Sequence, residues 1–290
     1  MAVHETELKT AVLGAGLVGL DLIDKIRRSP RLACALVAGR DSRTPGLRHA
    51  AEMGCATTAG GVQALLAAAP FDIVFDASSA AAHTAHAPLL AGAAPWLLDL
   101  TPSNLGLPAL PTVNSTEALA SRHISLISCG GQASIPLLHA ISQTCTPHYV
   151  EVVTTAATGT VGPASRLHID EYIVTTQDAI RAFTGTAHAK VLVNISPAQP
   201  PPPFRVTMTV RARDLDAARI HAAAHSAAHA VQSFAAGFAI TSCTVTGHKA
   251  TLSAEVRAPG GRLPSHAGNL HIINAAAVLL AEQHPGAKGR

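Results

Sequence analysis

The chain has 290 residues, of which 48% are hydrophobic and 13% are charged, and its formal net charge at pH 7 is +3 with the histidines neutral. This length and this hydrophobic content are typical of a soluble protein with two domains. The basic residues are dispersed and no apolar run is long enough to cross a bilayer, so we expect a cytoplasmic protein that binds neither nucleic acid nor membranes.

The first half of the chain alternates short apolar runs with alanine-rich stretches. The runs read as buried strands at 9–16, 32–39, 72–78, 96–101 and 124–130. Such alternation is typical of a doubly wound parallel sheet with helices on its faces. We therefore predict an α/β fold whose Rossmann-type, dinucleotide-binding domain comprises residues 1–130 and 265–290.

The second half has longer strand patterns with alternating polarity. They cover 148–160, 189–196, 204–212 and 250–258, and helices are predicted over 165–183 and 214–234. The proline run at 196–204 reads as a stiff connector, because proline cannot donate to a sheet ladder. We predict a second α+β domain over 131–264, with an open antiparallel sheet, one face of which must be covered. A closing helix over 267–283 is expected to return to the first domain.

A glycine motif follows the first predicted strand. In AVLGAGLVGLDLIDKI the glycines have the spacing G-x-G-x-x-G, between a strand and a helix. This spacing suits a dinucleotide pyrophosphate, which binds the helix N-terminus through backbone N–H groups. Asp41 lies 22 residues after Gly19, where a ribose-binding carboxylate is expected. NAD is therefore the predicted cofactor, although Arg40 and Arg43 leave NADP possible. The predicted binding residues here are Gly14, Ala15, Gly16, Leu17, Val18, Gly19 and Asp41.

Cys129 stands between a predicted strand and a predicted helix, in SLISCGGQASIPLLHA. A thiolate at a helix N-terminus is stabilised by backbone N–H groups, and the two glycines after it allow a substrate to approach closely. An isolated cysteine is more often a buried structural residue. Behind a dinucleotide fold, this junction favours a catalytic nucleophile.

The other cysteines and the histidines give weaker signals. Five widely spaced cysteines without a C-x-x-C pair predict neither a disulfide framework nor a zinc knuckle, and Cys34 reads as core. His221, His225 and His229 share one face of a predicted helix, but no carboxylate or cysteine completes a ligand set. We interpret them as a solvated stripe and expect no metal.

Several segments resemble one family in order and character. They are GAGLVGLDL, FDASSAAAH, LLDLTPSNLG, ISCGGQASIP, GPASRLHIDEY, SPAQPP and AGNLHI. The chain thereby resembles the acylating acetaldehyde dehydrogenases of bacterial aromatic degradation, which work beside an aldolase, and the resemblance covers nearly the whole chain. It implies that Cys129 adds to a small aldehyde, that hydride passes to NAD, and that coenzyme A takes up the acyl group, or the reverse. It also implies that the second domain, over 131–264, binds the substrate and forms a homodimer.

The same resemblance assigns further residues to the nicotinamide cofactor. The segment from Thr160 to His168 and the later Asn269 would contact it, the named contacts being Thr160, Val161, Gly162, Pro163 and Asn269. Read without the resemblance, GTVGPAS is simply a glycine and proline loop.

Four departures from the family pattern bear on function. Val206 stands where the family has an aspartate that assists catalysis, and valine cannot move a proton. His168 stands where the family has an asparagine, so we predict His168 as the catalytic acid or base. His271 replaces an aspartate in AGNLHI, and a shortened hairpin before it argues against the aldolase partner. Two alternatives stay open: a dehydrogenase or thioester reductase with another acyl acceptor, and a non-catalytic dinucleotide-binding relative.

Overall fold

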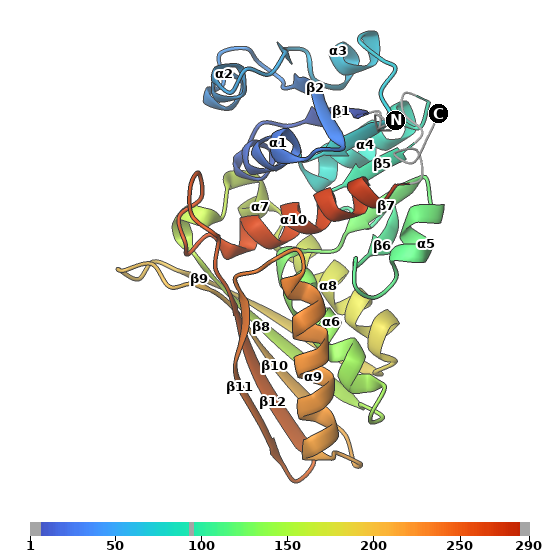
Figure 1. Ribbon diagram of the computed structural model, residues 1–290, viewed down its shortest axis with the longest axis vertical. Helices are drawn as coiled ribbons and strands as arrows, with labels where there is room; N and C mark the ends of the chain where they lie inside the picture. Colours follow the sequence, from blue (N-terminus) through green and yellow to red (C-terminus); the bar gives the residue numbers. More distant parts are fainter. Residues whose placement is uncertain (1–6, 93–95, 285–290) are drawn as a thin grey trace, which may run out of the picture. The chain divides into compact units, whose positions relative to one another are not determined.

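The computed structural model describes residues 7–92 and 96–284 (Figure 1). The chain divides into two compact units. Unit 1 extends to Leu126 and resumes at Asn274, and unit 2 is Ile127–Ile273. The sequence prediction put these boundaries at 130/131 and 264/265, four residues later at the first and nine residues earlier at the second.

Unit 1 contains a seven-stranded sheet in the order β3-β2-β1-β4-β5-β7-β6, and every strand pair in it is parallel. Strands β4 and β5 are buried at every position, as expected for a sheet that helices cover on both faces. The strand bounds are β1 Leu8–Leu13, β2 Leu32–Ala38, β3 Thr57–Thr58, β4 Ile73–Asp76, β5 Trp96–Asp99, β6 Leu107–Ala109 and β7 His123–Leu126. The predicted parallel sheet is thus confirmed, and the sequence pattern missed only the short strands β3 and β6.

The helices of unit 1 follow its strands. Their bounds are α1 Leu17–Arg28, α2 Pro45–Glu52, α3 Gly61–Ala67, α4 Ala80–Leu90 and α5 Ser115–Ala120, and α10 is Gly268–Gln283. The second half of α10 belongs to this unit, where the Asn274 amide donates to the Val18 carbonyl at 3.0 Å and to the Asp21 carboxylate at 2.7 Å. These bonds join the closing helix to α1.

Unit 2 begins with α6 and has a five-stranded sheet in the order β11-β12-β10-β8-β9. Its elements are α6 Cys129–Ser142, β8 Tyr149–Ala157, the 3₁₀ turn η1 Thr158–Thr160, α7 Pro163–Leu167, α8 Ile169–Thr184, β9 His188–Ser196, β10 Phe204–Arg211, α9 Ala217–Gln232, β11 Phe238–Thr246 and β12 Lys249–Val256. The prediction of a wholly antiparallel sheet was wrong, because β8 and β9 pair in parallel. The crossover through α7 and α8 carries the chain back before β9 starts, and a strand entered that way runs parallel to its neighbour.

One face of this sheet is covered by α6, α8 and α9, which lie side by side along it (Figure 1). Alternate residues of the central strand β10, from Phe204 to Val210, are buried toward these helices. The residues between them, such as Thr207 and Thr209, are hydroxyl-bearing or charged and half-buried or exposed. Among the residues that the structure describes, no helix is long and apolar enough to cross a lipid bilayer.

Candidate functional site

The glycine motif forms the turn from β1 into α1. Gly14 has a φ of 103°, and a Cβ there would lie 2.7 Å from the Ala77 carbonyl oxygen. A Cβ on Gly19 would collide with the Gly14 carbonyl oxygen. Both positions therefore require glycine, one for a left-handed backbone and one for close packing of helix on strand.

The N-terminus of α1 is open. Gly16 is the N-cap, and within the described chain no side chain caps this end and no atom lies within 4 Å of where a Gly16 Cβ would be. Ala15 is partly exposed, Leu17 is 44% exposed and Val18 is partly exposed. The first-turn N–H groups thus have no side-chain oxygen competing for them, which is the condition a pyrophosphate needs.

Asp41 lies three residues after β2 ends, and its carboxylate accepts hydrogen bonds from Arg43. The Arg43 guanidinium donates to both carboxylate oxygens, at 3.1 Å from Nε to Oδ1 and at 2.7 Å from Nη2 to Oδ2. This hydrogen bonding lowers the pKa of the exposed Asp41 carboxyl. The structure brings together the carboxylate predicted for NAD and one of the two arginines considered for NADP.

Cys129 is the first residue of α6. The preceding Ser128 caps the helix, since its hydroxyl accepts from the Gly131 N–H at 2.8 Å. The strand β7 ends at Leu126, so the thiol stands at the predicted junction of strand and helix. Capping by Ser128 leaves the other first-turn N–H groups near the sulfur, where they favour the thiolate.

Tyr172, in α8, is the neighbour of Cys129 that sequence reasoning missed. Its hydroxyl lies 3.6 Å from the Cys129 sulfur and accepts from the Gly130 N–H at 2.9 Å. A Cβ on Gly130 would collide with this hydroxyl and with Thr154 Oγ1. Gly130 is therefore the residue that lets the phenol reach the thiol. The available signal was that Tyr172 follows His168 by four residues on a predicted helix.

A hydroxyl relay, formed by Thr176 and Ser128, connects α8 and α6 next to Tyr172 and Cys129. Thr176 Oγ1 donates to the Tyr172 carbonyl at 2.6 Å, and it lies 2.8 Å from Ser128 Oγ. Because the single Thr176 proton is used, Ser128 must donate to Thr176. This relay joins α6 to α8 one turn below the thiol.

Burial raises the pKa of the Cys129 thiol, against the smaller opposite effects of the Tyr172 hydroxyl and the Gly130 N–H. Burial also raises the pKa of Tyr172 well above its ordinary value. Both groups are therefore protonated at neutral pH, and forming the nucleophile requires a proton acceptor.

His168, the predicted acid or base, caps α8 and contacts Glu171. Its Nδ1 lies 3.2 Å from the Glu171 carboxylate, and its backbone carbonyl accepts from the Tyr172 N–H at 3.1 Å. The hydrogen bond partner that the structure gives to the Cys129 sulfur is Tyr172. His168 precedes Tyr172 by one helical turn along α8, and its catalytic role stays a prediction.

Val206 lies in the middle of β10, is 1% exposed, and pairs with Thr154 of β8. Thr154 Oγ1 is buried beside Gly130, and its hydrogen bond with the Tyr172 hydroxyl opposes the rise that burial causes in the pKa of that phenol. An aspartate at position 206 would bring an acceptor to this neighbouring strand. The substitution noted in the sequence thus lies beside the strand residue that contacts Gly130 and Tyr172.

Two residues predicted to contact the nicotinamide cofactor meet within unit 2. The Asn269 amide donates to the Thr160 carbonyl at 3.0 Å, and its own carbonyl oxygen is buried without a partner in the described chain. Gly162 and Pro163 form the start of α7, where Pro163 is exposed, and Val161 is half-buried just before it. The loop at 160–163 and the helix α10 are thus joined, and the Asn269 carbonyl oxygen stays available as an acceptor.

The histidines of α9 do not gather around a common point with acids or cysteines. His225 and His229 are exposed and His221 is half-buried. Among the described residues, the one group of three with metal-ligating geometry lies elsewhere, in unit 1. The interpretation of these three as a solvated stripe fits their exposure.

Known proteins resemble this chain over nearly its full length. It is 49% identical over 280 residues to an acetaldehyde dehydrogenase of Streptomyces griseus subsp. griseus, which covers 97% of this chain and 91% of that protein. The chain belongs to the acetaldehyde dehydrogenase family. An acetaldehyde dehydrogenase of Geobacillus thermodenitrificans is 36% identical over 282 residues, covering 96% of both chains. Family membership confirms the predicted resemblance and the assignment as an aldehyde-oxidising enzyme that uses a nicotinamide dinucleotide.

Two further comparisons concern the fold of this family member. Residues 129–264 match the family described as prokaryotic acetaldehyde dehydrogenase, dimerisation. A crystal structure of aspartate semialdehyde dehydrogenase II from Vibrio cholerae matches with a TM-score of 0.64 at 15% identity, over 96% of this chain and 98% of that chain. At that identity the likeness confirms the fold, a Rossmann-type unit with a second α+β unit, and nothing beyond it.

Proposed function

We propose that this protein is an acylating aldehyde dehydrogenase that uses NAD, with Cys129 as its nucleophile and coenzyme A as the acyl acceptor. The observation that carries the proposal is the capped N-terminus of α6, where the Cys129 sulfur lies 3.6 Å from the Tyr172 hydroxyl in a member of this family. A thiol suits the reaction, because its acyl derivative is a thioester that remains activated for transfer.

The proposed reaction has two transfers, first of hydride and then of the acyl group. The Cys129 sulfur adds to the carbonyl carbon of a small aldehyde, which forms a C–S bond and a thiohemiacetal. The bound dinucleotide supplies the hydride acceptor. Loss of hydride from carbon and of a proton from oxygen leaves a thioester on Cys129. The thiol of coenzyme A then attacks the thioester, the C–S bond to Cys129 breaks, and the cysteine thiol is restored.

Tyr172 and His168 are the proposed proton-handling groups. The raised pKa of Tyr172 keeps its phenol protonated, so it can donate a hydrogen bond to the sulfur or to the developing oxyanion. It cannot serve as the base at neutral pH. His168, whose imidazole can accept a proton, is the proposed proton acceptor for the thiol and the thiohemiacetal oxygen.

Asn269 is the proposed contact for the carboxamide of the nicotinamide. Its buried carbonyl oxygen lacks a partner in the described chain, and a carboxamide N–H₂ is a donor of suitable kind. The hydrogen bond from Asn269 to the Thr160 carbonyl fixes the orientation of the amide, so this oxygen faces away from Thr160.

A second candidate function has one specific observation in its favour. Val206 removes the acid of the family pattern and places a buried apolar side chain beside Thr154, the residue that lies next to Gly130. Loss of an acid that assists coenzyme A would slow the acyl transfer to coenzyme A more than the hydride transfer to the dinucleotide. The alternative is a dehydrogenase that passes its acyl group to water, an amine or another thiol.

An aldehyde panel with NAD or NADP, with and without coenzyme A, tests these proposals at the nicotinamide absorbance. We expect sustained reduction of the dinucleotide with coenzyme A, and without it a burst limited to one equivalent per active site. Sustained turnover that is indifferent to coenzyme A would favour the alternative acceptor. Absence of any burst or turnover would favour a non-catalytic relative.

The choice of dinucleotide is proposed to depend on Asp41. Its carboxylate would accept from a ribose 2′-hydroxyl, and it would repel a 2′-phosphate. We expect Asp41→Ala to weaken NAD binding about tenfold, because one hydrogen bond to a charged group is lost. NADP binding should strengthen, because the freed Arg43 guanidinium can pair with the phosphate.

Calorimetric titration of both dinucleotides measures this change of preference. Asp178→Ala, which removes an exposed acid that pairs with Arg181 on α8, is the matched control and should alter neither affinity. Unchanged NAD affinity in Asp41→Ala would remove Asp41 from the proposed site.

The protein is proposed to be a homodimer. One face of the unit 2 sheet is covered by helices, and residues 129–264 match a dimerisation family. Light scattering should give about twice the 29.6 kDa mass of the chain. A monomeric mass across a hundredfold range of concentration would contradict the proposal. The shortened hairpin still argues against a stable aldolase partner.

A further inference from the structure

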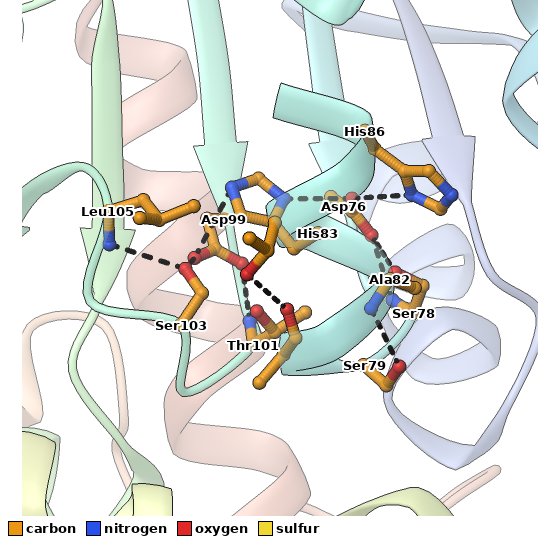
Figure 2. A network of polar contacts seen from close by, with 12 residues as sticks. Asp76, Ser78, Ser79, Ala82, His83, His86, Asp99, Thr101, Ser103 and Leu105 are labelled. Atoms are coloured by element: carbon orange, nitrogen blue, oxygen red, sulfur yellow. Dashed lines mark hydrogen bonds and ion pairs between the residues drawn. The ribbon is translucent and has the colours of Figure 1, made fainter. Parts of the chain in front are cut away.

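A buried cluster of imidazoles and carboxylates lies in unit 1, and the proposed function does not use it. Asp76 ends β4 and Asp99 ends β5, and His83 on α4 lies between these carboxylates (Figure 2). Asp76, His83 and Asp99 are fully buried. His123, at the start of β7, pairs in register with Leu97, two residues before Asp99, so it is on the same face of the sheet. Five groups from four elements thus meet, the fifth being His86.

Asp76 fixes the protonation of His83. The Asp76 carboxylate lies 2.8 Å from His83 Nδ1, and it also contacts His86 Nδ1 at 3.3 Å. These imidazole contacts, with the Ser78 hydroxyl, hold the pKa of Asp76 at about 2 despite its burial. An ionised Asp76 accepts the His83 Nδ1 proton, which leaves Nε2 as the nitrogen that would bind a metal ion. A carboxylate behind a histidine is the usual outer support of a metal-binding imidazole.

His83 Nε2 faces two further ligand atoms. His123 Nε2 lies at 3.0 Å and Asp99 Oδ2 at 3.5 Å, and the three atoms all lie within 4.8 Å of one another. In tetrahedral coordination with bonds of about 2.0–2.1 Å, ligand atoms are separated by about 3.3 Å. The two short separations in this cluster lie on either side of that value.

Asp99 is held as a metal-ligating carboxylate would be. The Thr101 N–H donates to Oδ1 at 2.7 Å, and the Ser103 and Ser125 hydroxyls both donate to Oδ2. These bonds fix the carboxylate while Oδ2 still faces His83. All three donors are neutral groups, so none of them balances the negative charge of the Asp99 carboxylate with a full positive charge.

The two buried carboxylates of the cluster need positive charge close to them. Asp76 and Asp99 are fully buried, and the ion-pair partners of both are imidazoles. A proton shared by His83 and His123 explains their 3.0 Å separation. Burial alone would lower the pKa of His83, but Asp76 and Asp99 raise it, so a His83 imidazolium that donates to His123 beside Asp99 is the alternative to a metal ion. A divalent cation between the three atoms satisfies all of them.

We propose that His83, Asp99 and His123 form a binding site for a first-row divalent cation, with zinc preferred. Imidazole and carboxylate ligands suit this ion, and three protein ligands leave a fourth position for water. His123 is only half-buried, so that edge of the cluster gives the ion access. The bound cation joins α4 to β5 and β7. The sequence prediction of no metal considered only the histidines of α9, and this set comes from three separate segments.

Zinc and cobalt binding to the full-length protein tests the proposal. After removal of metal with a chelator, we expect one equivalent of Co²⁺ per chain with the strong visible absorption of a tetrahedral site, and Zn²⁺ should displace it. His123→Gln should lower the affinity for either ion more than 100-fold, because losing a ligand costs more than losing an outer support. The glutamine amide can still donate to His83, so the unit should fold.

The matched control is His225→Gln on the exposed face of α9, which should bind cobalt as the wild type does. X-ray absorption of the zinc form should show imidazole nitrogen and oxygen around the ion. A wild-type protein that retains no metal at micromolar free Zn²⁺ overturns the proposal and leaves the shared proton as the explanation. It is also overturned by a loss of less than tenfold in His123→Gln, or by sulfur around the zinc.

Discussion

Cys129→Ser is expected to lower aldehyde oxidation by more than about 10³-fold, because a serine hydroxyl is a far weaker nucleophile and its ester is a poorer acyl donor. Dinucleotide affinity should stay within about twofold, since the sulfur is proposed to act on the aldehyde. Stopped-flow measurement of the nicotinamide burst, beside calorimetric titration of NAD, separates these two quantities. A variant that retains the burst would rule out the covalent route.

Cys243→Ser is the matched control for this experiment. Cys243 is half-buried on β11, at the edge of the unit 2 sheet, and its loss should change neither quantity. Alkylation by iodoacetamide gives a second check on Cys129 itself. Because burial raises the pKa of this thiol, the alkylation rate of the free protein should rise steadily with pH through the neutral range.

His168→Asn separates proton handling from covalent chemistry in the same assay. If His168 takes the proton, its replacement should slow turnover and flatten the pH profile near neutrality, where a histidine titrates. If turnover and profile are unchanged while Cys129→Ser is inactive, the thioester route stands and another group, such as Asp170 or water, moves the proton.

Gly130→Ala is expected to lower both the stability of the protein and its turnover. The new Cβ would collide with the Tyr172 hydroxyl and with Thr154 Oγ1, and Tyr172 is held by α8 packing against α6. Overpacking of this kind destabilises a protein by about 1–3 kcal/mol. Turnover should fall by more than the loss of stability explains, because the phenol is displaced from the Cys129 sulfur.

A double-mutant cycle with Tyr172→Phe tests the cause. Removing the hydroxyl relieves one of the two collisions, so the double variant should regain part of the stability that Gly130→Ala loses, but not the turnover. Gly159→Ala is the control, because no atom lies within 4 Å of a Cβ there. Additive losses in the cycle would show that Tyr172 is not the residue Gly130 accommodates. Denaturant unfolding measures the stabilities.

The sequence by itself determined the features that depend on neighbours along the chain. The glycine spacing after β1 requires a left-handed turn at Gly14 and close packing at Gly19, and both follow from the absence of a side chain. Alternation of apolar runs with helices predicts a parallel sheet, because parallel strands need crossovers. The place of Cys129 between a strand and a helix also follows from its neighbours along the chain.

Only the tertiary structure decided what lies beside these features. Tyr172 and Cys129 are 43 residues apart, and Thr160 and Asn269 are 109 apart, so no periodicity could pair them. The parallel pairing of β8 with β9 follows from where the crossover returns the chain, which the strand pattern alone does not specify. His83, Asp99 and His123 meet only because neighbouring strands bring their positions to one face. A sequence pattern reports which face of an element is buried, and packing decides which buried faces meet.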